Sequence, residues 1–207
     1  MSAQQTAFYA QNGYLELEGL LTPAECETLL QAIHQTMKKR GKEEAVNGRD
    51  LWRDAPRLKT TLTSKKFQGL AFAVGKQPSL RLAFDQWFPP HFALQTPEKI
   101  ERLFSIQGLV SILFIQLDPG TPEAPHTTLL GLSPFPHGQG NALLMKPSLL
   151  VNWPSNHSNI GLYCVGFCLP TSVYIHNPHD PAGISLRKLD YGYGDPLRND
   201  SHPLLHP

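Results

Sequence analysis

The eight residues VSILFIQL at positions 110–117 decide the fold class of this 207-residue chain. The run is rich in β-branched and other large apolar side chains, and it contains no glycine, proline or charged residue. A continuous apolar run of this length is typical of a strand that is buried on both faces. Asp118, Pro119 and Gly120 follow it, and these residues favour a turn. We therefore predict a central strand over 110–117.

Charged residues are scarce on both sides of this strand. The stretch 102–186 contains only five of them, which are Arg102, Asp118, Glu123, Lys146 and Asp180. The whole chain is 17% charged, and at that average an 85-residue stretch would carry about 14. The scarcity predicts either a heavily buried sheet or the lining of an apolar pocket.

Further short strands are expected around the central one. Each candidate segment is bounded by glycine, proline, asparagine or serine, as strands in an all-β region commonly are. The candidates are 103–106, 127–132, 142–146, 149–153, 160–168 and 171–175. Short strands at this spacing are typical of an antiparallel barrel or jelly roll.

The N-terminal half has helical signals instead. Thr22 can cap a helix, Pro23 suits the first turn, and Glu25 completes a capping box, so a helix is predicted over 23–40. Its apolar side chains form one stripe, which consists of Cys26, Leu29, Leu30, Ile33 and Met37. The segments 66–74 and 78–87 also have helical composition, and 13–19 alternates like a half-buried strand.

These signals together predict an α+β fold, a double-stranded β-helix (jelly roll, cupin-like) with an N-terminal helical layer. The length favours a single domain over 1–207. Within it we expect a mainly helical layer with the first strand over 1–100, the β-helix core over 101–186, and a C-terminal segment over 187–207.

Composition excludes several classes of function. Eighteen Lys and Arg against 17 Asp and Glu give a net charge of +1, which provides no basic field for nucleic acid or an anionic membrane. We see no signal peptide and no apolar run of membrane-spanning length, so we expect a soluble, cytoplasmic protein. Cys26, Cys164 and Cys168 lack the spacing of a zinc site or disulfide framework and are expected to be reduced, buried thiols.

Two stretches resemble a known family. The sequence FYAQNGYLELEGLLTPAEC at 8–26 is similar to the N-terminal segment of phytanoyl-CoA dioxygenase-like proteins, with Asn-Gly-Tyr, an alternating strand and a capped helix in one order. The sequence GNALLMKPSLL at 140–150 resembles a Gly-Asp-x-Leu strand and the following Leu pair of the same family. The resemblance implies a jelly roll behind a helical layer, and small-molecule oxidation with Fe(II), 2-oxoglutarate and O2.

The iron-binding residues that the resemblance implies are not found at their expected places. Such a site needs two His and one carboxylate, with open positions for cosubstrate and O2. None of the nine His has Asp or Glu two residues later, and 105–107 and 116–118, where that motif would lie, read Ser-Ile-Gln and Gln-Leu-Asp. The distal His position falls at 151–153, which reads Val-Asn-Trp. The Arg that would bind 2-oxoglutarate falls at 162–163, and no Lys or Arg occurs between Lys146 and Arg187.

Several residues nevertheless remain candidates for lining a pocket. They are Gln116, Asp118, His126, His137 and Asn152. His126 and His137 bracket the predicted strand over 127–132 and could face one cavity, although no third ligand is identified. His176, His179 and Asp180 form a second cluster, which we interpret as a polar turn rather than a metal site.

The leading hypothesis is a phytanoyl-CoA dioxygenase-like protein with a degenerate iron and 2-oxoglutarate site, acting as a non-catalytic binding or scaffold protein. In that case no cofactor is expected. The competing hypothesis is an active Fe(II)/2-oxoglutarate-dependent oxygenase acting on a small molecule, with His126, His137 and Asp118 as rearranged ligands. A third is a cupin-like binder or isomerase without redox chemistry. The expected partner is a small-molecule ligand or another protein, with no nucleic acid and no membrane.

Overall fold

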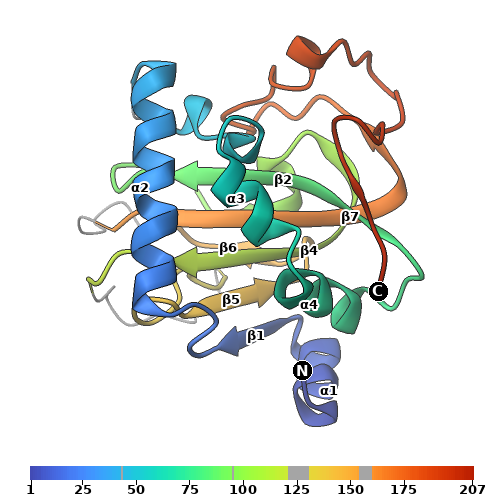
Figure 1. The fold of residues 1–207 in the computed structure, drawn as a ribbon. Helices are drawn as coiled ribbons and strands as arrows, with labels where there is room; N and C mark the ends of the chain where they lie inside the picture. The colour runs from blue at the N-terminus through green and yellow to red at the C-terminus, as the bar shows by residue number, and fades with distance from the viewer. Residues whose placement is uncertain (43, 95, 121–130, 154–159) are drawn as a thin grey trace.

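A six-stranded antiparallel sheet forms the centre of the computed structural model, which describes the chain except residues 43, 95, 121–130 and 154–159 (Figure 1). Its strand order is β1-β5-β4-β7-β2-β8. The strands are β1 (Tyr14–Leu17), β2 (Leu80–Phe88), β4 (Ile106–Gln116), β5 (Ala142–Met145), β7 (Leu162–Tyr174) and β8 (Leu204–Leu205). The predicted central strand is confirmed, because β4 lies between β5 and β7 and its residues from Ser111 to Gln116 are all buried.

A second, smaller sheet consists of β3 (Glu98–Lys99) and β6 (Leu150–Val151). Leu132 adds one parallel bridge to Val151. Within the described parts of the chain, the two sheets do not close into a complete barrel. The antiparallel sheet and the helical layer of the predicted fold are therefore present, and the closed jelly roll is not seen.

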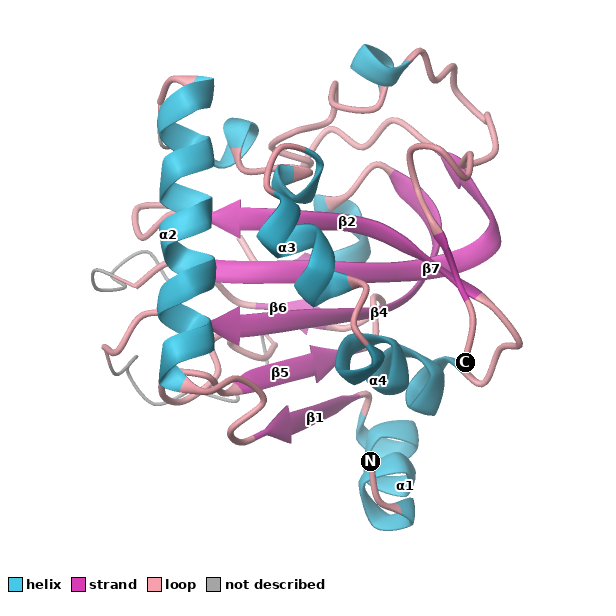
Figure 2. Ribbon diagram, viewed as in Figure 1, coloured by secondary structure: helices cyan, strands magenta, loops and turns pink. Residues whose placement is uncertain are grey.

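Helices cover one face of the large sheet, as Figure 2 shows. They are α2 (Pro23–Arg40), α3 (Pro56–Leu62) and α4 (Lys65–Gly75), while α1 (Ala3–Asn12) lies at the edge of the sheet beside β1. Short 3-10 helices lie in the connections: η1 (Ala45–Asn47), η2 (Leu51–Arg53), η3 (Ile100–Leu103) and η4 (Arg187–Leu189). Among the described helices, none has the length and apolar character that a membrane span requires.

The helix α2 begins and ends as its sequence predicts. The Thr22 hydroxyl accepts a hydrogen bond from the Glu25 amide at 3.2 Å, and the Glu25 carboxylate accepts one from the Thr22 amide at 2.8 Å. This reciprocal pair satisfies two amides that have no partner inside the helix. The apolar side of α2, including Cys26, Leu29 and Ile33, packs against the sheet.

The large sheet is apolar on both faces, so it separates two cores. On the helical side, Leu113 and Val165 pack with helical residues such as Leu29 and Phe67. On the opposite side, which we call the inner face, the sheet residues pack with η3 and the second sheet. The inner-face residues of the sheet include Phe84, Phe88, Ile112, Phe114 and Cys164. Burial on both faces explains why the strands within 102–186 contain so few charged residues.

The structure corrects three local predictions. The predicted strand 103–106 is the end of η3 and the connection to β4, which begins at Ile106. The segment 78–87 is not a helix but most of β2, and all nine residues of β2 are buried. Burial between two strands and two cores outweighs the weak helical preference of this segment. The predicted strands 160–168 and 171–175 form one strand, β7, which continues past Pro170. The predicted strand 127–132 lies largely outside the described residues.

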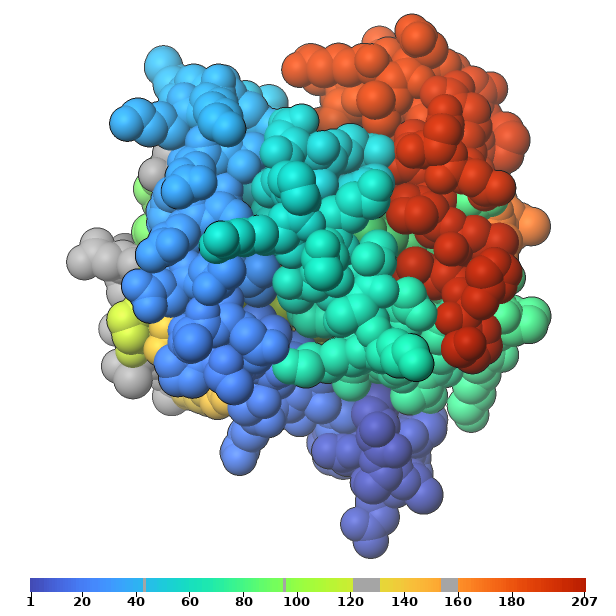
Figure 3. Space-filling model, in the orientation of Figure 1, coloured from blue at the N-terminus to red at the C-terminus, as the bar shows by residue number. Residues whose placement is uncertain are grey.

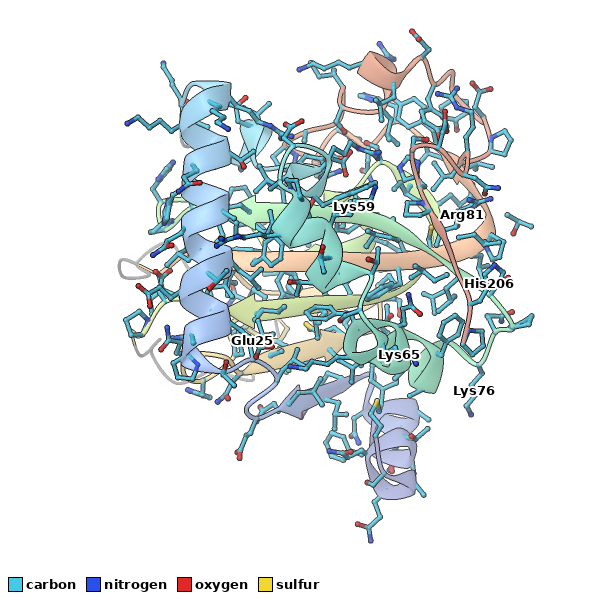
Figure 4. All side chains as sticks on the ribbon, viewed as in Figure 1. Glu25, Lys59, Lys65, Lys76, Arg81 and His206 are labelled. Atoms are coloured by element: carbon cyan, nitrogen blue, oxygen red, sulfur yellow. The ribbon has the colours of Figure 1, made fainter. Side chains whose placement is uncertain are left out.

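The C-terminal segment crosses the beginning of β2, where Leu80 pairs with Leu205. Arg81 fixes this crossing, because its guanidinium donates to the carbonyls of Pro170 and His202 and to the side chain of Asn199. Figure 4 shows Arg81 and His206 on this side of the molecule. The three cysteines are free and buried, as expected.

Candidate functional site

Five aromatic side chains gather on the inner face. We call this group the aromatic cluster; it consists of Phe88, Phe92, Phe114, Phe135 and Trp153. The Trp153 ring lies at its centre, with ring centroids of Phe88 at 4.7 Å, Phe92 at 4.9 Å, Phe135 at 5.7 Å and Phe114 at 6.0 Å. Each of these four rings meets the Trp153 ring edge to face, which is a favourable arrangement for aromatic rings. The cluster makes this part of the inner face strongly apolar.

A buried ion pair lies beside the aromatic cluster. The Arg49 guanidinium donates to the Asp180 carboxylate at 2.8 Å and 3.4 Å, and both side chains are nearly inaccessible to solvent. Arg49 also lies 5.0 Å from the ring centroids of Phe84 and Phe104, which stack on each other at 3.9 Å. Its Nε donates to the Gln86 side-chain oxygen at 2.8 Å.

The Asp180 carboxylate is fully engaged by these and two further donors. The Ser105 amide donates at 2.7 Å and the Ala182 amide at 2.8 Å. The interpretation of 176–180 as a polar turn agrees with this geometry, although Arg49 was not foreseen as its partner. Arg49 and Asp180 are 131 residues apart in sequence, so no local pattern could have linked them.

Gln116 and Asp118 lie together at the end of β4, but the side chains of both form hydrogen bonds to backbone groups. The Gln116 side-chain amide donates to the carbonyls of Asp118 and Gly120, and its oxygen accepts from the Gly138 amide at 3.0 Å. The Asp118 carboxylate accepts from the Gly161 amide at 3.1 Å. These contacts hold the ends of three segments together at one end of the sheet.

The remaining predicted pocket residues do not converge with them as side chains. His137 is exposed, and its carbonyl accepts from the Asn141 side chain in the turn that Gln116 holds. Asn152 lies after β6, where its amide donates to the Leu132 carbonyl at 2.8 Å. His126 lies outside the described residues. Of the described candidates, Gln116, Asp118 and His137 thus lie near the end of β4, whereas Asn152 lies beside the second sheet.

A buried carboxyl group on the helical side was missed by the sequence analysis. Asp85 on β2 accepts a hydrogen bond from the Tyr163 hydroxyl at 2.6 Å and from the Trp52 amide at 3.2 Å. Burial is the largest influence on Asp85 and raises its pKa to about 7, against the opposing effect of these donors. An aspartate inside the apolar run at 80–88 was the available signal.

The described residues do not fit a site with two His and one carboxylate. No group of three or more His, Cys, Asp or Glu that could hold a metal occurs among the residues whose positions are given. At the predicted position of the distal His, Trp153 packs into the aromatic cluster. The side chains of Glu123, His126 and His157 belong to the segments that are not described.

Comparison with known proteins places the fold. No family model matches the chain, and no curated protein matches it. Among solved structures, the non-heme alpha ketoglutarate dependent carbocyclase SnoK from nogalamycin biosynthesis is similar, with a TM-score of 0.76 and 15% identity over 99% of this chain and 96% of SnoK. The epimerase SnoN in complex with Fe3+, alpha ketoglutarate and nogalamycin RO gives 0.68 and 16% over 98% of both chains. HygX from Streptomyces hygroscopicus, with nickel and 2-oxoglutarate bound, gives 0.57 and 12% over 82% and 87%.

These neighbours contradict the expectation that no cofactor is involved. That expectation followed from the missing sequence motifs alone, whereas the neighbours include structures that hold Fe3+ with alpha ketoglutarate and nickel with 2-oxoglutarate. The similarity is too low in sequence to identify the phytanoyl-CoA dioxygenase-like subfamily. At the level of fold, the chain has the architecture of non-heme, alpha ketoglutarate-dependent enzymes.

Proposed function

We propose that this protein is an oxygenase of the non-haem Fe(II)/2-oxoglutarate superfamily that acts on a small molecule. The observation that carries the proposal is the agreement in fold with SnoK, which extends over 99% of this chain and 96% of that one. The agreement therefore includes the helical layer as well as the sheet. Because fold alone does not establish activity, the metal and the cosubstrate have to be tested directly.

The inner face supports a substrate with an apolar or planar part. Phe92 is half-buried, and its ring meets the buried ring of Trp153 at 4.9 Å. A ligand that packs against Phe92 would contact an edge of the aromatic cluster, where ring-to-ring contacts are favourable. The residues of this face provide binding and orientation, and no chemical step is assigned to them.

The first experiment is reconstitution of the purified chain with Fe(II) and 2-oxoglutarate under anaerobic conditions. We expect stoichiometric iron by metal analysis, and succinate release after O2 is admitted. When bound, iron and 2-oxoglutarate supply the oxidising chemistry of this superfamily. A chain that binds neither iron nor 2-oxoglutarate would overturn the proposal.

One variant, with a matched control, then tests His126 as an iron ligand, as proposed from the sequence. His126→Ala is expected to lose iron if His126 is a ligand, with His91→Ala as the matched control because His91 is exposed. Unchanged iron content in His126→Ala would remove His126 from the set and leave the superfamily proposal to the metal analysis above.

A second candidate function is ligand binding without turnover. It is favoured by the described residues, which do not bring together three or more His, Cys, Asp or Glu that could hold a metal. Its signature would be a higher melting temperature with sugars, acyl-CoA or 2-oxo acids, because a ligand that binds only the folded state stabilises it by mass action. Succinate release would exclude it.

A further inference from the structure

The strand β1 leaves one edge of the large sheet open. The strand order places β1 at the end of the sheet, and among the described strands it pairs only with β5. The Gly13 carbonyl accepts a hydrogen bond from the Lys146 amide at 2.7 Å, so these two residues form a hydrogen-bonded pair of the antiparallel ladder. Backbone groups alternate in direction along a strand. Those of Leu15 therefore face β5, whereas those of Tyr14 and Glu16 face away from the sheet.

The outward backbone groups of β1 are available for pairing. Neither Tyr14 nor Glu16 forms a backbone hydrogen bond to a described segment beyond the edge. A row of such groups is a template for one more strand. β1 is only four residues long, so the added strand is short as well.

A groove of about 520 Å³ lies along this edge. Its lining consists of Gln4, Gln5 and Phe8 from α1 and Tyr14, Leu15 and Glu16 from β1. Figure 3 shows α1 projecting at the bottom of the molecule, next to the residues of β1. Phe8 is 42% exposed, and its ring meets the Tyr14 ring edge to face at 5.6 Å. The groove therefore combines open backbone groups with an aromatic side chain that a molecule from solution can reach.

The charge of the groove selects the kind of partner. Glu16 is the charged residue of the described lining, and it is exposed. Glu18, two residues further, is exposed as well, and neither forms an ion pair with any described residue. A basic residue opposite Glu16 in an added strand makes a favourable cross-strand pair. A second copy of this chain bound through the same edge would instead bring the acidic residues of both copies together, which is destabilising.

We propose that the β1 edge binds an extended basic segment of another protein as an additional antiparallel strand. The amides and carbonyls of the segment pair with those of Tyr14 and Glu16. A Lys or Arg of the segment lies opposite Glu16, and an apolar side chain two residues further lies opposite Tyr14 and beside Phe8. The site is independent of the proposed oxygenase function, because β1 contributes no residue to the aromatic cluster.

The probe is a synthetic peptide, acetyl-Thr-Lys-Val-Phe-Thr-amide, titrated into the full-length protein and followed by NMR. In the proposed register its Lys lies opposite Glu16 and its Phe lies opposite Tyr14. We expect saturable binding that slows the hydrogen exchange of the Glu16 amide, because this amide gains a partner. The Leu15 amide faces β5 and serves as the internal reference. No binding at about 1 mM peptide, or binding that leaves the Glu16 amide unprotected, would overturn the proposal.

Two N-methylated peptides separate backbone pairing from side-chain contacts. N-methyl groups on the Lys and Phe of the peptide remove the two donors that face β1, whereas one on the central Val removes a donor that faces away. We expect the first peptide to bind about tenfold more weakly, because two hydrogen bonds are lost. The second is expected to bind like the unmodified peptide. Equal affinities of the two N-methylated peptides would contradict the added strand.

A charge exchange tests the role of Glu16. Glu16→Lys is expected to weaken the Lys peptide by about threefold, and to strengthen by a similar factor a peptide with Glu in place of Lys. Glu27→Lys is the matched control, because Glu27 is exposed on α2 and does not line the groove. The same changes in Glu27→Lys would place the peptide elsewhere and contradict the proposal.

Sedimentation of the protein alone tests the other occupant of this edge. We expect a species of one chain. A dimer that the Lys peptide dissociates would assign the β1 edge to a second copy of this chain and overturn the proposal.

Discussion

At the scale of single residues, Asp85 is a carboxyl group in an environment that disfavours its charge. It is completely buried between β2 and the helices, with Tyr163 and Trp52 as hydrogen-bond donors. Burial raises its pKa from 3.8 to about 7. The carboxyl group is therefore largely protonated in the folded protein at mildly acidic pH, where the unfolded chain would have lost the proton.

This raised pKa predicts a pH dependence of stability that Asp85→Asn removes. The folded state binds more protons than the unfolded state between pH 3.8 and about 7, so the free energy of unfolding falls as the pH rises through that range. Linkage between protonation and folding puts this fall in the free energy of unfolding, from below pH 3.8 to above pH 7, at up to about 4 kcal/mol. Urea unfolding of both proteins at several pH values, followed by circular dichroism, measures the difference between them.

His202 acts in the opposite direction, which is why the difference between the two proteins is the useful quantity. Burial, together with Arg53 and Arg81, lowers the pKa of His202 from 6.5 to about 3. The unfolded state then binds more protons between those values, so stability falls as the pH drops through them. If the difference between wild type and Asp85→Asn stays constant from pH 4 to 7, the raised pKa of Asp85 is wrong.

At the scale of elements, β7 depends on one glycine. β7 pairs with β4 on one side and β2 on the other, and a Cβ added at Gly166 would lie 2.4 Å from the Phe84 ring. That ring is stacked against Phe104 at 3.9 Å and cannot move away freely. We expect Gly166→Ala to lower the free energy of unfolding by about 1–3 kcal/mol or more, through overpacking.

Gly69→Ala is the matched control for this substitution. Gly69 lies within α4, and an added Cβ would meet no atom within 4 Å. Alanine there should raise the stability by about 1 kcal/mol, since glycine is a poor helix former. Equal unfolding midpoints in urea for Gly166→Ala and wild type would show that the Phe84 ring yields easily.

The elements differ in how far their sequences could predict them. The helix α2 carries its own start and stop signals, so local rules locate it. The strand β2 has no such signals, and its burial depends on β7 and β8 from the other end of the chain. Pro170 suggested a break in β7, but the strand continues through it. Pro170 lies between the last residue paired with β2 and the final residues paired with β4, where the ladder needs no amide hydrogen.

The same reasoning applies to the candidate site. The chain direction changes after the central strand at Asp118, Pro119 and Gly120, as these residue types predict, and the Gln116 side chain bonds to the Asp118 carbonyl there. The aromatic cluster and the Arg49–Asp180 pair were not predicted, since their members come from separate segments that only the folded sheet brings together. Apolar residues in strands are common, and their sequence does not show which of them meet.

At the scale of the whole molecule, the strand order joins the two halves of the chain. Among the strands that the structure describes, β1 pairs only with β5, and Tyr14 lies opposite Met145. β2 pairs with β7 and β8, and both lie in the second half. Neither β1 nor β2 has a partner strand within the first hundred residues that the structure describes.

This arrangement predicts that a chain shortened after Gly161 does not fold. It lacks β7, the strand that joins β2 to β4, so we expect no cooperative transition in urea. A chain shortened after Leu205 keeps every strand and serves as the control. A sigmoidal transition in the chain ending at Gly161 would show that residues 1–161 form a stable fold without β7.

The strand order also has a consequence for synthesis in the cell. β7 ends at Tyr174, 86 residues after β2 ends at Phe88. At about 5–20 residues per second, a ribosome needs about 4–17 s to make that stretch. Until β7 is made, β2 lacks the strand that joins it to β4, and a nascent chain with exposed apolar strand and helix faces is prone to aggregation. We therefore expect chaperones that bind the nascent chain during this interval to reduce its aggregation.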